Sequence, residues 1–299
     1  MSSSKMRSFS IFICIIVFTA VLIFTVSFFW RKNHSEKEGD VAHLLSDIAA
    51  KKETVLPQAD PKQIEVKGLA STRLTEKQLA LPLYIYPSSG EKSWRDALQS
   101  AESVDFIIAN VNNGPGDSSE EAWRNIIPRT VATGIKIYGY VYTLYGRRDG
   151  AIVDEEISRW LKLYPEVSGF FLDEVSDDID NLPYYVERYK YIKTLGNKTV
   201  VINPGTVTDE GYMNASDVNT IFESSYDSWQ DTTFPTWINK YSSDRFYAIV
   251  YNVPDETKMQ SVVSSAFKNN ITKVFITDGA TPSDSLPYYF EAETKALLR

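Results

Sequence analysis

The stretch "VSGFFLDEVSDD", residues 167–178, decides the fold predicted for this chain. An apolar run from Val167 to Leu172 ends directly in two adjacent acids, Asp173 and Glu174. Continuous apolar runs of this kind are typical of parallel strands that are covered on both faces. In α/β barrels the carboxyl ends of such strands open onto the loops that form the active site. The stretch therefore predicts a buried strand whose carboxyl end carries active-site residues.

Residues 79–299 repeat this arrangement, because short β-branched and aromatic runs alternate with longer amphipathic segments. Strands are expected at 81–87, 104–111, 135–143, 168–174, 198–204, 218–224, 245–253 and 272–279. Helices are expected at 93–101, 118–134, 153–163, 182–195, 233–241, 257–269 and 287–298. The alternation predicts an α/β fold, a (β/α)8 TIM-type barrel in one domain, with a doubly wound open sheet as the alternative.

The N-terminal part of the chain carries a long uncharged segment at residues 9–30. It is long enough to cross a bilayer, which takes roughly 20 apolar residues. It ends in aromatic residues and lacks the small-residue site at which signal peptidase cuts. We therefore expect an uncleaved signal anchor in the cell membrane. A cleaved signal, which would release a secreted protein, is the alternative.

The domain order follows from this segment. Residues 1–8 are expected to be a short cytoplasmic N-terminus and residues 9–30 a single transmembrane helix. Residues 31–78 are polar and poor in aromatics, which predicts a flexible stem. Residues 79–299 are expected to form the extracellular barrel.

The charge of the chain changes at the same boundary. Residues 1–78 carry a net charge of +3 and residues 79–299 a net charge of −11. An acidic globular domain argues against nucleic acid and against polyanionic substrates. It fits solubility outside the cell, or a cleft for neutral or cationic substrates. We expect a monomer.

Several kinds of catalysis are excluded by composition. The one cysteine, Cys14, and the two histidines, His34 and His43, all lie in the first 43 residues. The rest of the chain therefore has no Ser-His-Asp or Cys-His machinery, no thiolate or imidazole zinc ligands and no disulfide. Neither common phosphate-binding loop occurs. We expect no cofactor and no metal, so that carboxylates, hydroxyls, amides and aromatics carry the chemistry.

Three carboxylates are the candidate catalytic groups. Asp173 and Glu174 end the fourth expected strand, and Glu223 is the penultimate residue of the sixth. Side chains alternate along a strand, so Asp173 and Glu174 should point in different directions. Two carboxylates across a barrel opening suit glycoside hydrolysis, in which one acid protonates the leaving oxygen and the other attacks the anomeric carbon or activates water. Crowding would raise the pKa of one of them.

A hard-cation site is the competing interpretation of the same acids. Asp173, Glu174, Asp177 and Asp178 could supply oxygen ligands to calcium or magnesium. Asp177 and Asp178, however, are expected mainly as first-turn acids of the next helix, where negative charge is favourable.

Other polar and aromatic residues follow the expected strands and are candidates for substrate binding. Aromatic faces stack on pyranose rings, although each aromatic taken alone also fits ordinary packing. The candidates are Tyr86, Asn110, Asn112, Tyr142, Arg147, Asn203, Tyr226, Trp229 and Tyr251.

Six motifs occur in register along the barrel region: "YIYP", "NVNNGPG", "GYVYTLYGRR", "GFFLDEVS", "NPGT" and "IFESSY". Together they resemble spherulation-specific family 4, the spherulin-4-like proteins of glycoside hydrolase family 135. The resemblance implies a (β/α)8 enzyme that cleaves α-1,4-linked N-acetylgalactosamine in galactosaminogalactan, a biofilm polysaccharide. It also implies that Asp173 is the nucleophile or transition-state carboxylate, that Glu223 is the acid/base, and that Glu174 supports them or binds substrate.

Two functions from different classes remain open at this point. One is a membrane-anchored endo-glycosidase acting on an extracellular amino-sugar polymer. The other is a non-catalytic lectin or adhesin on the same barrel. Retention of all three carboxylates favours the enzyme. The pattern of residues leaves the linkage and the stereochemical course undecided.

Overall fold

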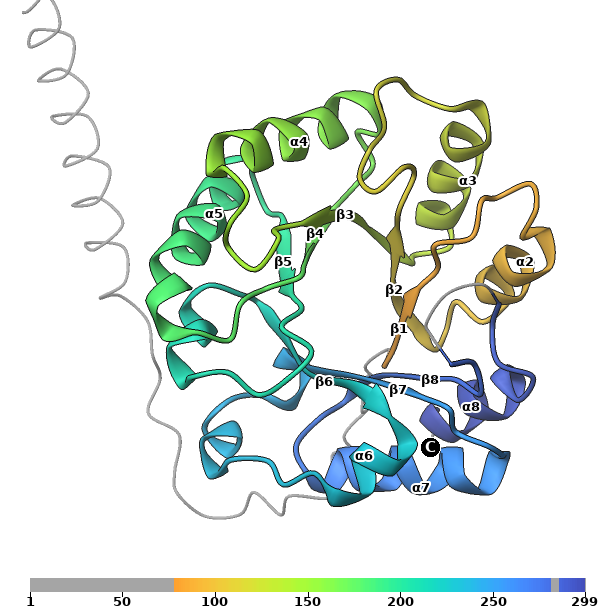
Figure 1. Ribbon diagram of the computed structural model, residues 1–299. Coiled ribbons are helices and arrows are strands. Elements are labelled where there is room, and N and C mark those ends of the chain that lie inside the picture. Colours follow the sequence, from red (N-terminus) through yellow and green to blue (C-terminus); the bar gives the residue numbers. More distant parts are fainter. Residues whose placement is uncertain (1–77, 281–284, 299) are drawn as a thin grey trace, which may run out of the picture. The chain divides into compact units, whose positions relative to one another are not determined.

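The computed structural model describes residues 78–280 and 285–298. Eight parallel strands close into one barrel in sequence order, as predicted (Figure 1). They are β1 Leu79–Pro82, β2 Val104–Ala109, β3 Lys136–Tyr142, β4 Gly169–Asp173, β5 Thr199–Ile202, β6 Val218–Ser225, β7 Phe246–Tyr251 and β8 Lys273–Ile276.

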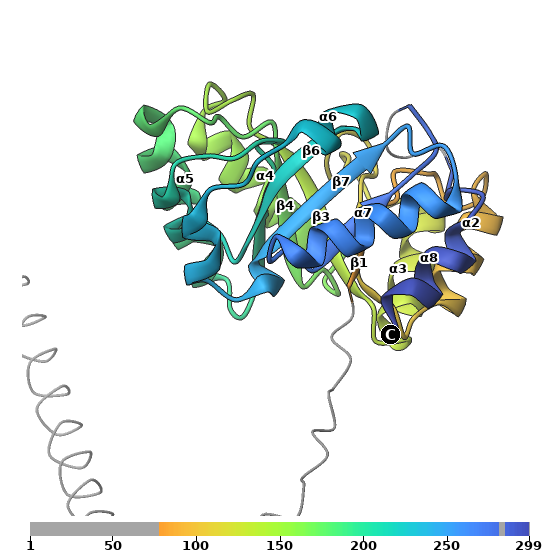
Figure 2. The ribbon, with the colours of Figure 1, turned by 90° about the horizontal axis from the view of Figure 1, so that it is seen from below.

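Helices surround the barrel, and α7 and α8 lie side by side outside the strands (Figures 1 and 2). The helices are α2 Glu91–Gln99, α3 Glu121–Ala132, α4 Gly150–Leu163, α5 Leu182–Thr194, α6 Tyr226–Asp231, α7 Glu256–Lys268 and α8 Phe290–Leu297. Short 3-10 helices occur at Ile179–Asn181, Glu210–Asn214, Thr236–Lys240 and Ser243–Arg245.

Two elements differ from expectation. The first strand ends at Pro82 because the chain turns there, with the Leu83 amide donating to the Leu81 carbonyl (2.9 Å). The helix expected at 233–241 is wrong, since only a 3-10 helix forms within that range. An α-helix begins earlier, at Tyr226, because the Ser225 hydroxyl accepts the Ser228 amide and caps it.

An aromatic layer fills the barrel interior. The ring of Phe106 lies 4.5 Å from that of Tyr138 and 5.8 Å from that of Tyr247, and all three side chains are buried. The Tyr247 hydroxyl donates to the Ala80 carbonyl at 2.6 Å and so links β7 to β1. This solid interior supports the residues above it at the carboxyl ends of the strands.

The amino ends of the strands carry an ionic cluster. The Asp105 carboxylate on β2 accepts hydrogen bonds from Lys136 Nζ at 2.7 Å and from Lys273 Nζ at 2.5 Å. These two lysines are the first residues of β3 and β8. Asp105 and Lys273 are buried, so each charge depends on the other for compensation. The cluster lies at the opposite end of the strands from Asp173.

No helix within residues 78–280 and 285–298 combines the length and the apolar character that crossing a membrane would take. The anchor predicted at 9–30 lies outside the described residues, as does all of the predicted stem except its last residue.

Candidate active site

Three consecutive strands bring two of the predicted acids together through one amide. The Asn203 Nδ2 donates to Asp173 Oδ1 at 2.8 Å and to Glu223 Oε2 at 2.5 Å. Because one nitrogen contacts both carboxylates, these two oxygens lie at most 5.3 Å apart, the sum of the two hydrogen-bond lengths. The predicted meeting of Asp173, Asn203 and Glu223 at one opening is therefore present in the structure.

The loop after β5 fixes the orientation of the Asn203 amide. The Asn203 Oδ1 accepts the amide of Gly205 at 3.1 Å, so its Nδ2 must face the acids. Gly205 adopts a positive φ of 67°, and its carbonyl accepts the Glu223 amide at 2.9 Å. The turn thus positions the amide and the start of the Glu223 side chain together.

Tyrosines complete the surroundings of Asp173. The Tyr140 hydroxyl donates to Asp173 Oδ2 at 2.8 Å, so both oxygens of Asp173 accept hydrogen bonds. The ring of Tyr84 packs edge-on against that of Tyr140 at 5.4 Å. Burial, followed by the charge of Asp173, raises the pKa of both tyrosines, which therefore stay protonated at neutral pH.

Tyr84 and Tyr140 were not among the predicted binding residues. Alternation along the strand could have identified Tyr140, because it lies two residues before Tyr142 and shares its face. The same argument would have named Tyr84, two residues before Tyr86 in the expected strand 81–87, but β1 ends at Pro82, so strand alternation does not explain the position of Tyr84.

Glu223 is the acid suited to carry a proton. Burial raises its pKa to about 7; the Asn203 hydrogen bond opposes this, and the charge of Asp173 adds to it. Asp173, Glu174 and Glu223 take part in none of the ion pairs among the residues that the structure describes. A carboxyl with a pKa near 7 can act as a general acid at neutral pH.

Glu174 plays a different part from Asp173. Its backbone is left-handed, with φ of 50°, and its carbonyl accepts the Tyr145 amide at 2.6 Å and the Thr143 hydroxyl at 2.8 Å. Its Oε2 is buried without a hydrogen-bond partner among the described residues. Glu174 thus joins the end of β4 to the loop after β3.

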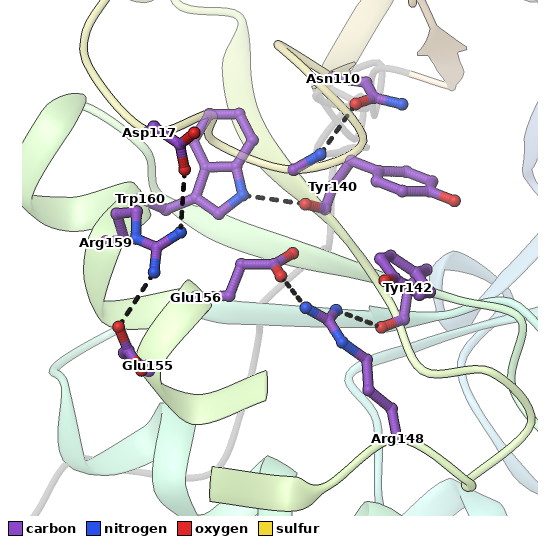
Figure 3. A network of polar contacts seen from close by, with 10 residues as sticks. Asn110, Asp117, Tyr140, Tyr142, Arg148, Glu155, Glu156, Arg159 and Trp160 are labelled. Carbon is purple, nitrogen blue, oxygen red and sulfur yellow. Dashed lines mark hydrogen bonds and ion pairs between the residues drawn. The ribbon is translucent and has the colours of Figure 1, made fainter. Parts of the chain in front are cut away.

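The loop after β3 is held by Arg148 (Figure 3). The Arg148 guanidinium lies 4.0 Å from the centre of the Tyr142 ring, donates to the Tyr142 carbonyl at 2.8 Å and pairs with Glu156 of α4. Tyr142 is the register partner of Asp173 on the neighbouring strand. Arg147, the predicted binding residue, is exposed and donates to the Leu144 carbonyl at 3.1 Å.

Figure 3 also shows what Asn110 does: its Oδ1 accepts the Gly114 amide at 3.0 Å and so shapes its own loop. Asn112 is exposed. Tyr86 is 42% exposed and lies edge-on to Trp123, with ring centres 6.4 Å apart.

The remaining predicted binding residues follow β6 and β7. Tyr226 begins α6, and Tyr251 ends β7; both are half-buried. Trp229 is only 5% exposed and packs against Phe222 at 4.9 Å, which places it in the core and leaves little of the indole for a sugar.

One of the acids after Asp173 and Glu174 serves as a helix cap. The Asp178 Oδ1 accepts the Asp180 amide at 3.0 Å and caps the 3-10 helix Ile179–Asn181. This position agrees with the prediction that Asp178 lies at the start of the next helical segment. Within the part of the chain that the structure describes, no group of three or more acids, histidines or cysteines is placed to hold a metal ion.

Comparisons with known proteins give a family and a fold. The family model described as "Spherulation-specific family 4" matches residues 78–297. Spherulin-4 of Physarum polycephalum is 28% identical over 233 residues, which cover 74% of this chain and 70% of that protein. The crystal structure of Sph3 from Aspergillus clavatus in complex with GalNAc matches with a TM-score of 0.66 at 22% identity, covering 75% of this chain and 98% of that chain. The structural match confirms the barrel fold.

Proposed function

The chain belongs to spherulation-specific family 4, as its six motifs predicted, and from this premise we propose that it is an endo-acting glycoside hydrolase of an amino-sugar polysaccharide. The observation that carries the proposal is the Asp173–Asn203–Glu223 arrangement. It combines a carboxylate that only accepts hydrogen bonds with a carboxyl that holds a proton near neutral pH. Glycoside hydrolysis needs this division of roles.

The separation of the carboxylates supports a retaining course. Retaining glycosidases keep their carboxyl groups about 5–5.5 Å apart, whereas inverting enzymes leave about 6.5–9.5 Å for a water molecule. Asp173 Oδ1 and Glu223 Oε2 lie no more than 5.3 Å apart, which is below the inverting range. In the proposed mechanism Asp173 attacks the anomeric carbon while Glu223 protonates the leaving oxygen. Glu223 then deprotonates the water that releases the sugar from Asp173.

The proposed substrate is an α-1,4-linked N-acetylgalactosamine polymer of the galactosaminogalactan type. Family membership supports this choice, and so does the sugar bound to Sph3. The net charge of −11 on residues 79–299 is compatible with a neutral or partly de-acetylated, cationic polymer.

Incubation with defined polymers tests the function. The protein should release oligosaccharides from α-1,4-linked N-acetylgalactosamine polymer, detected by mass spectrometry, and not from the corresponding glucosamine polymer. Proton NMR of the first products should show the α-anomer. Binding of the polymer without any release would identify the lectin alternative, and an initial β-anomer would reject the retaining mechanism.

The pH profile should depend on Asn203. Its hydrogen bond lowers the pKa of Glu223, so Asn203→Ala should raise that pKa and move the alkaline limb of kcat/KM to higher pH, while kcat falls. Tyr140→Phe is the matched control, because Tyr140 donates to Asp173 and not to Glu223. It should lower kcat and leave the alkaline limb in place. If the alkaline limb of kcat/KM lay at the same pH in Asn203→Ala and in the wild type, Glu223 would not be the titrating acid.

We also propose that residues 9–30 anchor the protein in the cell membrane, with the barrel outside. The support for the span is the uncharged length of this segment. The flanking charges, Lys5 and Arg7 before it and Arg31 and Lys32 after it, are balanced and favour neither orientation. The native protein should stay in the membrane fraction after alkaline carbonate washing. N-terminal sequencing that begins after Trp30 would instead identify a cleaved signal and a secreted protein.

A further inference from the structure

Two consecutive apolar side chains are exposed just after β3, the strand that pairs with β4 and its last residue, Asp173. Leu144 is 41% exposed and Tyr145 is 52% exposed, and both follow β3 directly after Thr143. Both have left-handed backbones, with φ of 52° and 56°, and Gly146 continues with φ of 77°. A left-handed conformation is unfavourable for residues with a Cβ, so the surrounding structure must hold this turn.

The end of β4 is what holds it. The Tyr145 amide donates to the Glu174 carbonyl at 2.6 Å, and the Thr143 amide donates to the Asp173 carbonyl at 2.9 Å. The buried Thr143 hydroxyl lies 3.0 Å from the Asp173 carbonyl and 2.8 Å from the Glu174 carbonyl. The backbone of Tyr145 is therefore fixed directly to Glu174, and Thr143, which precedes the exposed pair, is fixed to Asp173.

Arg147 adds charge to the same surface. Its guanidinium lies 5.8 Å from the centre of the Tyr145 ring, and its Nε donates to the Leu144 carbonyl at 3.1 Å. Tyr145 and Arg147 thus form an exposed platform that combines an aromatic ring with hydrogen-bond donors. Such a combination suits a sugar ring, whose apolar C–H groups stack on an aromatic face and whose hydroxyls accept hydrogen bonds.

We propose that the Tyr145–Arg147 platform binds a second sugar of the polymer, next to the sugar whose bond is broken at Asp173. Tyr145 stacks on that ring, and Arg147 donates to its hydroxyls. The proposal rests on the proposed function, because the platform adjoins the same site. A site that holds two neighbouring sugars binds an oligosaccharide more tightly than a single sugar.

Calorimetry in an Asp173→Asn background tests the platform without hydrolysis. The probes are α-1,4-linked N-acetylgalactosamine hexasaccharide and the monosaccharide N-acetylgalactosamine, with full-length protein. Adding Tyr145→Ala should weaken hexasaccharide binding about tenfold, the value expected for one lost stacking contact. Monosaccharide binding should change far less, and Tyr145→Phe, which keeps the ring, should retain most of the affinity.

Phe267→Ala is the matched control, because Phe267 is an exposed aromatic (38%) near the end of α7. It should leave both affinities unchanged. Hexasaccharide affinity within twofold of the background in Tyr145→Ala, or an equal loss in Phe267→Ala, would overturn the platform. Hexasaccharide binding that depends on Tyr145, with no cleavage by the wild type, would leave the platform standing and reject the hydrolase. Binding of neither sugar would reject both.

Discussion

Replacement of Asp173 by Asn should lower kcat by about a thousandfold or more, because an amide cannot attack the anomeric carbon. Folding should be nearly unchanged, since amide and carboxylate have almost the same shape. Asp173 accepts hydrogen bonds from Asn203 and Tyr140. The amide oxygen can still accept the Asn203 bond, and the Tyr140 hydroxyl can rotate to accept from the new amide nitrogen.

Steady-state kinetics on the polymer measure the loss of kcat. Calorimetry with the hexasaccharide shows whether the variant still folds and binds substrate. Asp177→Asn is the matched control, because it removes a nearby charge from an exposed position and should behave as the wild type. If Asp173→Asn retained more than a tenth of wild-type kcat, Asp173 would not be the nucleophile. Activity that required added calcium or magnesium would instead revive the cation site.

Replacement of Glu223 by Gln should separate substrates by their leaving groups. Natural polymer, whose leaving sugar oxygen needs a proton, should lose activity by roughly a hundredfold or more. Aryl glycosides with acidic phenol leaving groups need no proton in the first step and should lose much less. Kinetics on a series of aryl glycosides measures this dependence. An equal loss on every substrate would contradict the acid role.

The same variant should be more stable than the wild type at alkaline pH. The folded-state pKa of Glu223, about 7, lies above its ordinary value of 4.5, so the folded protein holds this proton more tightly than the unfolded chain does. Wild-type stability should therefore fall as pH rises from 4.5 through 7, by roughly 1–3 kcal/mol. Glu223→Gln avoids this loss. Thermal unfolding should give the variant an advantage at pH 8 that disappears at pH 4.

The barrel was predictable because each strand repeats one local pattern. Alternation of apolar runs with amphipathic helices is visible in any one segment, and eight repeats leave few other architectures. The positions of Asp173, Asn203 and Glu223 followed from their place at strand ends. The role of Asn203 did not, because one amide can bridge two acids only when β4, β5 and β6 are neighbours in space.

Errors arose where tertiary contacts or short caps decided the structure. Strand β1 stops at Pro82, so Tyr84, and not Tyr86, packs against Tyr140. Trp229 is an aromatic next to a catalytic strand, yet its contact with Phe222 buries it. Neither outcome is visible in composition or periodicity, which report only whether a residue suits a strand or a helix.

The missing counter-charge around the acids has a consequence for inhibition. Asp173 and Glu223 are surrounded by uncharged donors, and none of the ion pairs in the described part of the chain includes them. These hydrogen bonds stabilise the negative charge on Asp173, but no cationic side chain in the described part of the chain pairs with it. A sugar ring supplies this positive charge only in the transition state, when it resembles an oxocarbenium ion. The site is thus preorganised for a cation, and ring-nitrogen sugars that are protonated in solution should be its tightest ligands.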